Sequence, residues 1–181
     1  MIFDPFLPFI ASAYRVKYAT EPWEFRDAAA LRRRVFCDEQ GLFEDDDRDE
    51  IDRIAIPLVA LSFLGLDSDE VVGTVRIHEA EPGLWWGSRL AVAERYRKVG
   101  QIGAGLIRLA VSSAHARGCK CFLAHVQSQN APLFHKLHWE TLAEIEIHGR
   151  PHHHMRADLS HYPPIADAET GFLSLPKRLA A

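Results

Sequence analysis

The chain of 181 residues carries a net charge of −4 with histidine neutral, and its length suits one domain but not two of full size. Hydrophobic residues make up 48% and charged residues 25%, which is typical of a soluble globular protein with a sizeable core. The acidic balance argues against a dedicated nucleic-acid binder, and no stretch approaches the ~20 apolar residues of a membrane span.

Residues 1–13 are apolar but do not form a signal peptide, because they lack a basic start and are interrupted by Asp4, Pro5 and Pro8. Leaving so much apolar surface in water is costly, so we expect an arm that packs on the domain or on the partner subunit of a homodimer. A frayed terminus is the alternative.

Alternating apolar residues over 14–19 predict a short strand. Apolar residues three to four positions apart then predict a helix from Glu24 to about Glu39, capped by Thr20 and ended by Gly41. Residues 44–52 hold seven acidic residues against one basic residue. Such a run resists packing and predicts a solvated loop or a short charged helix, although it could also lie at the mouth of a site and attract a cationic amine.

Three strands should follow, separated by an Asp-Ser-Asp cluster and a Glu-Pro-Gly turn, and these hairpin signals predict antiparallel pairing. Helices then alternate with strands, and residues 161–181 form a tail without periodicity. This order is typical of an α+β domain with a mixed sheet, here over residues 14–160. The expected strands are 56–66, 71–78, 84–92, 119–126, 139–147 and 152–159, and the expected later helices are 100–117 and 130–138.

The segment Gly100–Gly105 is rich in glycine and opens a helix. Exposed backbone N–H groups and the helix dipole together make such a place suited to phosphate or pyrophosphate. The spacing is neither a Walker loop, since no Gly-Lys-Ser/Thr closes it, nor the dinucleotide G-x-G-x-x-G. An ordinary glycine-containing turn is the alternative.

Several motifs resemble one family. Residues 89–92, Tyr96-Arg97 and 100–107 resemble the acetyl-CoA motif of the GNAT N-acetyltransferases, and residues 131–139 resemble the family helix that ends in "FYEKLGF". Residues 31–40 with Asp49 and Asp52, and residues 149–152 with Met155, resemble a GNAT branch related to acyl-homoserine-lactone synthases. Residues 102–139 are similar to a bacterial group linked to nitrilase gene clusters. The resemblance covers roughly residues 14–160.

The resemblance implies a GNAT-like fold, with a mixed, mostly antiparallel central sheet flanked by helices in α/β/α layers. It also implies acetyl-CoA as co-substrate. The backbone of Leu90, Ala91 and Val92 would hold the pantetheine arm, Arg97 would lie near the phosphates, and Gln127 or Asn130 could bond the pantetheine amides. The pyrophosphate would lie on the segment formed by Gly100, Gln101, Ile102, Gly103, Ala104 and Gly105.

Two departures from the family pattern bear on the mechanism. Counted from Arg97, the glycine segment has one residue more than the common spacing. Phe134 also stands where many members carry a tyrosine general acid, and phenylalanine has no proton to give. The resemblance therefore leaves water or another residue as the acid.

An amine that attacks a thioester must be neutral, so a group must remove its proton. Glu79, at the end of a central strand, is the first candidate, and His78 and His125 compete with it. We expect no metal, because in a strand only the outer two of His152–His154 share a face. Cys37, Cys119 and Cys121 lack zinc-finger spacing and are read as reduced thiols of a cytoplasmic protein.

The expected function is therefore acetyl-CoA-dependent N-acetylation of a small-molecule amine. Two alternatives stay open: a non-catalytic acyl-CoA-binding sensor, which the missing tyrosine favours, and an acyltransferase like the acyl-homoserine-lactone synthases.

Overall fold

A computed structural model describes residues 13–64 and 67–175, so the expected N-terminal arm lies, except for Ala13, outside the described residues. Within these ranges an eight-stranded sheet has the order β6-β7-β5-β4-β3-β2-β1-β8. Every neighbouring pair is antiparallel except β4–β5, which is parallel. The prediction of a mixed, mostly antiparallel sheet is confirmed, and so is the antiparallel meander of β2, β3 and β4.

The strands and helices fall close to the expected ranges. The strands are β1 Tyr14–Tyr18, β2 Ile56–Leu64, β3 Asp67–Glu81, β4 Leu84–Val92, β5 Cys121–Gln127, β6 Trp139–Ile147, β7 Arg150–Ala157 and β8 Phe172–Ser174. The helices are α1 Pro22–Arg33, α2 Gly100–Ala116 and α3 Ala131–Lys136. Each helix of the described ranges is too short or too polar to cross a bilayer.

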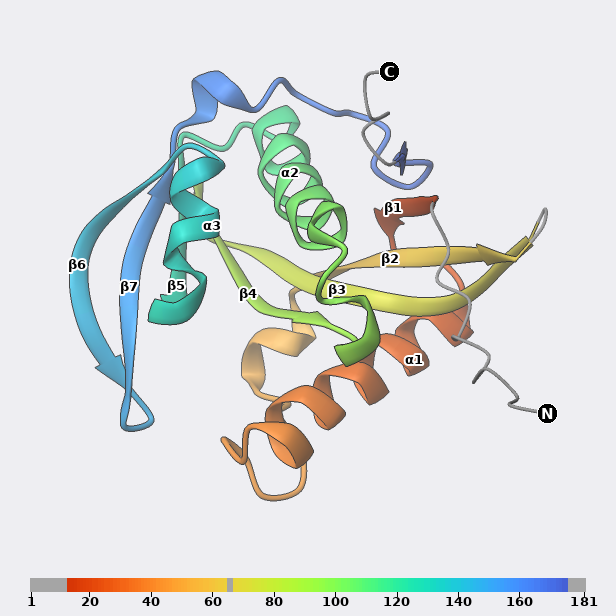
Figure 1. The fold of residues 1–181 in the computed structure, drawn as a ribbon. Coiled ribbons are helices and arrows are strands. Elements are labelled where there is room, and N and C mark those ends of the chain that lie inside the picture. Colours follow the sequence, from red (N-terminus) through yellow and green to blue (C-terminus); the bar gives the residue numbers. More distant parts are fainter. Residues whose placement is uncertain (1–12, 65–66, 176–181) are drawn as a thin grey trace, which may run out of the picture.

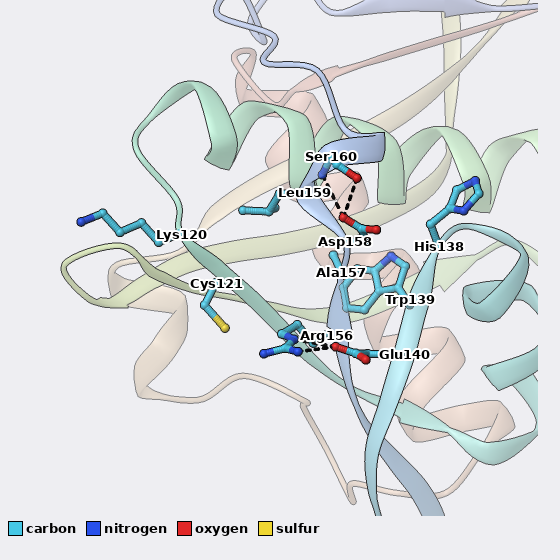
Figure 2. Close-up of a pocket in the computed structure, with 10 residues that line it drawn as sticks. All are labelled: Lys120, Cys121, His138, Trp139, Glu140, Arg156, Ala157, Asp158, Leu159 and Ser160. Carbon is cyan, nitrogen blue, oxygen red and sulfur yellow. Dashed lines mark hydrogen bonds and ion pairs between the residues drawn. The ribbon is translucent and has the colours of Figure 1, made fainter.

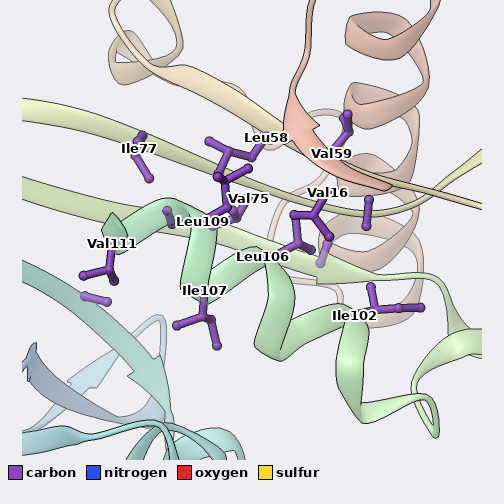
Figure 3. Close-up of a cluster of buried hydrophobic side chains, with 14 of the residues drawn as sticks. Val16, Leu58, Val59, Val75, Ile77, Ile102, Leu106, Ile107, Leu109 and Val111 are labelled. Atoms are coloured by element: carbon purple, nitrogen blue, oxygen red, sulfur yellow. The ribbon is translucent and has the colours of Figure 1, made fainter. Parts of the chain in front are cut away.

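The sheet lies between helical layers, with α1 on one face and α2 and α3 on the other (Figure 1). Both helical layers contact β3, and consecutive β3 residues from Val72 to Ile77 are buried whichever way they point. Val16, Leu58 and Val75 of the strands pack with apolar residues of α2 in the cluster of Figure 3. The central strands are thus held rigidly from both sides, as the α/β/α prediction requires.

Gly73 of β3 allows the close approach of α2. A Cβ at this position would lie 2.9 Å from Ile102 Cγ2 and 2.9 Å from Leu106 Cδ1, closer than real Cβ contacts come. The start of α2 therefore lies directly on the middle of the sheet, next to the end of β4.

Two boundaries differ from the sequence expectation. The long first helix divides into α1 and a π-helical turn over Arg34–Glu39, and its N-cap is Glu21 rather than Thr20. The segment expected to be a tail contributes β8, which pairs with β1 from Phe172↔Val16 to Ser174↔Tyr14. Residues 172–174 of the expected tail are therefore part of the sheet.

Candidate functional site

The two parallel strands at the centre of the sheet separate halfway along their length. β4 and β5 pair from Leu84↔Cys121 to Gly87↔Ala124 and no further. Beyond that point β4 still pairs with β3 as far as Val92, and β5 still pairs with β7 as far as Gln127. Residues 88–92 and 125–127 therefore form two limbs of a V-shaped opening, whose facing backbone groups are not paired with each other.

A β-bulge on β4 accompanies this separation. Thr74 pairs with Ala91 and Arg76 with Ser88, so Arg89 and Leu90 together oppose Val75. Arg89 has a φ of 56°, in the left-handed region that non-glycine residues seldom adopt. A bulge bends its strand and increases the local twist, which accounts for β4 turning away from β5.

A cavity of about 480 Å³ fills the opening. It brings together four of the expected cofactor-binding residues: Leu90, Gln127, Asn130 and Phe134. The Phe134 ring is buried and lies edge-on to Trp139, with centroids 5.1 Å apart. Gln127 Nε2 donates a hydrogen bond to Gln40 Oε1 at 2.9 Å, which ties β5 to the turn after α1.

The glycine-rich segment lies beside the opening but is helical. α2 begins at Gly100, so residues 100–105 are its first turns rather than a loop that precedes it. From Gly103 onward the N–H groups are used within the helix, and the N–H of Ile102 already donates to Val99 O at 3.1 Å. Backbone N–H groups able to bind an anion are thus expected only before Gly103. Of the six residues expected to bind the pyrophosphate, those from Gly103 to Gly105 therefore have no free N–H group to offer.

Gly100 leaves open space at the start of α2. A Cβ there would meet no atom within 4 Å, whereas one at Gly103 would lie 3.9 Å from Leu133 Cδ2 of α3. Arg97, expected near phosphates, donates from Nε to Val92 O at 3.0 Å and forms an ion pair with Glu39. It therefore links the end of β4 to the turn after α1.

Glu79 is not brought to the cavity. It is exposed, and its Oε1 accepts a hydrogen bond from Gly83 N–H at 2.8 Å in the β3–β4 turn. Because strand residues alternate in direction, its side chain points to the opposite face from His78, which does line the cavity. The Nδ1 atom of His78 is buried and has no hydrogen-bond partner among the described residues.

His125 is the first residue of β5 past its last pairing with β4, and it lines the cavity. Its ring lies edge-on to Trp86 and to His154, with centroids 5.0 Å and 5.1 Å away. Partial burial lowers the pKa of His125, and the neighbouring His154 and His152 lower it further. Burial also lowers the pKa of His78, with Arg76 adding to the effect. Both shifts favour the neutral form of the imidazole, which is the form that accepts a proton.

The three consecutive histidines of β7 alternate as expected. His152 lines the cavity and His154 stacks on Trp86, whereas His153 faces the other way and contacts Thr141 Oγ1 at 3.0 Å. Across residues 13–64 and 67–175, His, Cys, Asp and Glu side chains form no group of three that could hold a metal ion.

The acidic run is not simply solvated. Asp47 is 1% exposed, and its Oδ2 accepts hydrogen bonds from Arg32 Nε at 2.8 Å and Arg89 Nε at 3.0 Å. Asp52 pairs with Arg32 at 2.6 Å and with Arg76 at 2.8 Å. The expectation of a solvated loop is therefore wrong for Asp47 and Asp52, because arginines of α1, β3 and β4 supply partners. The alternative of a short charged helix is confirmed for Glu50–Arg53, which form a 3-10 helix.

Asp49 completes the network and reaches the cavity. Arg76 donates to both of its oxygens, at 2.6 Å and 2.8 Å, and Arg89 Nη2 lies 3.3 Å from Oδ2. Hydrogen bonding by Arg76 is the main reason that the pKa of Asp49 lies below its ordinary value. Burial alone would raise the pKa of Asp52, but hydrogen bonds from Arg32, Asp49 N–H and Arg76 hold it well below that value.

A second cavity, of about 550 Å³, lies at the other end of β5 (Figure 2). Its polar lining includes Cys121, an Arg156–Glu140 ion pair, and Asp158 bonded to Ser160. It contains none of the residues that the sequence nominated for cofactor binding or catalysis. The separation of β4 and β5, where Leu90, Gln127, Asn130 and His125 line one cavity, is the candidate site.

Comparison with known proteins agrees with this geometry. The family model described as Acetyltransferase (GNAT) family matches residues 20–139, more than half of the chain. A Bacillus subtilis (strain 168) protein whose name describes an acetyltransferase is 28% identical over 139 residues, or 76% of this chain and 91% of that protein.

Two solved structures share the fold. A Lactobacillus plantarum protein described as an N-acetyltransferase has a TM-score of 0.69 at 21% identity, covering 80% of this chain and 97% of its own. BjaI, a CoA-dependent acyl-homoserine lactone synthase solved with SAM and isopentyl-CoA, has a TM-score of 0.64 at 15% identity. The match covers 80% of this chain and 83% of the BjaI chain. At these identities the likeness concerns the fold. The family match shows that the chain belongs to the GNAT acetyltransferases, whose members transfer acyl groups from CoA.

Proposed function

We propose that the protein transfers the acetyl group of acetyl-CoA to the amine of a small molecule. The observation that carries the proposal is the separation of β4 and β5 next to the start of α2, with a cavity between the two limbs. Unpaired backbone N–H and C=O groups at the centre of a sheet need hydrogen-bond partners. The amides of the pantetheine arm would supply such partners, in the way that an added strand does. The backbone of Leu90–Val92 would form one side of this opening, and Gln127 and Asn130, which line the cavity with Leu90, the other.

The start of α2 would bind the CoA phosphates. Helix N-termini attract anions through their N–H groups and dipole, and the open space at Gly100 lets a phosphate approach the backbone. Lys98 precedes the helix and adds positive charge, whereas the charge of Arg97 is paired with Glu39. The adenosine and phosphates would thus remain near the surface while the thioester reaches into the cavity.

His125 is the proposed base. A free alkyl amine has a pKa near that of lysine, about 10.4, so it is mostly charged at pH 7. His125 would first take one proton from the bound ammonium group and release it to solvent, which leaves a neutral amine. It would then take a second proton from the nitrogen as that atom bonds to the thioester carbon and the carbon–sulfur bond breaks. The same imidazolium can then protonate the CoA thiolate, which balances the reaction without a tyrosine at position 134. Glu79 is a weaker candidate for the base than His125, because its side chain points away from the cavity and is bonded to the β3–β4 turn.

Binding of the cofactor is tested by thermal unfolding with and without CoA. A ligand at 100 times its dissociation constant adds about 2.7 kcal/mol of stability, so CoA should raise Tm. Gly100→Glu should abolish this shift while leaving the fold intact, because a Cβ at this position meets no atom within 4 Å and the carboxylate beyond it would repel a phosphate at the helix start. Ala116→Glu, an exposed site at the far end of α2, is the matched control. An undiminished CoA shift in Gly100→Glu would contradict the proposed site.

Phe134 supports a second candidate function, a non-catalytic sensor of acyl-CoA. Its buried ring offers no proton to the leaving thiolate, although it can pack against a cofactor. Release of free thiol from acetyl-CoA with any amine favours the transferase, whereas CoA binding without thiol release favours the sensor. Dependence on an acyl carrier protein would instead favour a reaction like that of the acyl-homoserine-lactone synthases.

A further inference from the structure

The walls of the cavity, away from the pantetheine limbs, are largely apolar and aromatic. They come from three separate parts of the chain: the segment after α1, β4 and the end of β6. These residues are Phe36, Leu42, Phe43, Ile51, Trp86 and Ile147. Such walls favour a ligand with an apolar body, because each buried methylene contributes about 0.8 kcal/mol of transfer free energy.

A carboxylate able to pair with a cationic ligand is missing from the described part of the lining. Asp49 is the sole acidic residue there, and its two oxygens already accept hydrogen bonds from Arg76, Arg89 and the N–H of Ile51. A ligand ammonium group would have to displace a bidentate guanidinium, which matches a carboxylate better than an ammonium does. Asp49 is therefore not free to pair with a ligand ammonium group.

The other charged side chains at this wall are arginines that are already paired. Arg76 and Arg89 both line the cavity, and each pairs with Asp49 and with a second carboxylate outside the lining. The Arg89 guanidinium lies 4.7 Å from the centroid of the Phe43 ring, so charge and aromatic surface occur together. A second ammonium group on the acceptor would therefore meet no free carboxylate at this wall.

We propose that the acceptor is an aralkyl monoamine: a primary amine on an aromatic body, with no second positive charge. This inference rests on the proposed acetyl transfer, since it concerns the acceptor of that reaction. The amine would reach His125 beside Trp86, and the aromatic body would lie against the wall of Phe36 and Phe43.

Two matched amine pairs test the proposal with acetyl-CoA as donor. Butylamine and 1,4-diaminobutane differ in the second charge, and phenethylamine and ethylamine differ in the ring. We expect kcat/KM at least ten-fold higher for butylamine than for the diamine, and at least ten-fold higher for phenethylamine than for ethylamine. Equal or better turnover of 1,4-diaminobutane would overturn the proposal while leaving acetyl transfer in place.

Binding gives a readout independent of turnover. With saturating CoA, phenethylamine should raise Tm further and 1,4-diaminobutane should not. If phenethylamine stabilises the CoA complex but no thiol is released from acetyl-CoA, the ligand class stands and the transferase function fails. If neither amine shifts Tm or is acetylated, both inferences fail.

The aromatic wall is tested by Phe43→Leu and Phe43→Ala, with Phe25→Ala as control. Phe25 is also a phenylalanine but is 44% exposed on α1 and does not line the cavity. The Phe43 variants should reduce the phenethylamine-to-ethylamine ratio of kcat/KM at least five-fold, with the leucine variant kept in case the alanine variant folds poorly. The CoA-induced Tm shift reports that each variant is folded. An unchanged ratio in Phe43→Leu would remove this ring from the acceptor site.

Discussion

Replacement of Asp47 by asparagine tests whether the buried ion network holds the site together. Asp47 is 1% exposed, and one oxygen accepts hydrogen bonds from the guanidinium groups of Arg32 and Arg89. Asparagine keeps the shape and an acceptor oxygen but removes the charge, so three arginines would face two aspartates.

The expected loss follows from these contacts. A hydrogen bond to a charged group contributes about 1.5–3 kcal/mol and a neutral one about 0.5–1.5, so two weakened bonds lose roughly 2 kcal/mol. Removing one partner of a buried pair outright costs about 3–5 kcal/mol. Arg32 keeps Asp52 and Arg89 keeps Asp49, so we expect a value between these limits, about 2–4 kcal/mol.

Urea unfolding at pH 7 measures the change, with the slope m compared to confirm that the unfolded state is unaltered. The control is Asp46→Asn, whose exposed partner Arg48 lies 3.3 Å away and whose loss should cost less than about 0.5 kcal/mol. If Asp47→Asn loses under about 1 kcal/mol, or no more than the control, the network does not stabilise the segment.

Four further predictions concern the core, acid stability and the chemistry. Gly73→Ala should destabilise by about 1–3 kcal/mol in urea unfolding, because the new Cβ would lie 2.9 Å from two side-chain carbons of α2; unchanged stability would mean that α2 shifts freely. The pKa of Asp52 is lowered in the folded protein, so its contribution is present above its unfolded pKa of about 4 and is lost as pH falls below it. Asp52→Asn should therefore flatten the loss of stability between pH 5 and pH 2, and a curve parallel to that of the wild type would contradict this. Phe134→Tyr should keep or increase turnover, whereas Phe134→Ala should cost about 3–5 kcal/mol; a large loss of turnover in the tyrosine variant, with CoA affinity kept, would show that an apolar ring is required. His125→Gln should lower turnover about 10²–10⁴-fold at pH 7, less at high pH where the amine deprotonates unaided, while Glu79→Gln should be nearly silent; the reverse pattern would restore Glu79 as the base.

Periodicity and turn residues were enough to predict most of the fold. The strands 84–92 and 139–147 begin and end where the sequence predicted, because turn residues or a helix end bound each of them. The three residues of β8 could not be found in this way. They are too few to show alternation, and they form a strand because β1 offers them backbone partners.

The site was predicted less completely, because its geometry depends on long-range pairing. The acidic residues of the run are satisfied by arginines that lie between 15 and 42 positions away in the chain. Local composition cannot show such partners, so the run was read as solvated. The choice between His78 and Glu79 depended on which face each side chain takes, and a shift of one residue along a strand reverses that face.

The edge strand β6 shows how this open sheet avoids pairing with a strand of another molecule. Among the described residues β6 pairs only with β7, so one row of its backbone groups faces outward. Glu140, Glu144 and Glu146 place carboxylates along this strand, and Glu140 is already engaged by Arg156. Two copies approaching edge to edge would bring like charges together, which disfavours intermolecular strand pairing. The central strands can thus stay apart to bind a ligand, while the charged β6 edge disfavours pairing with another chain.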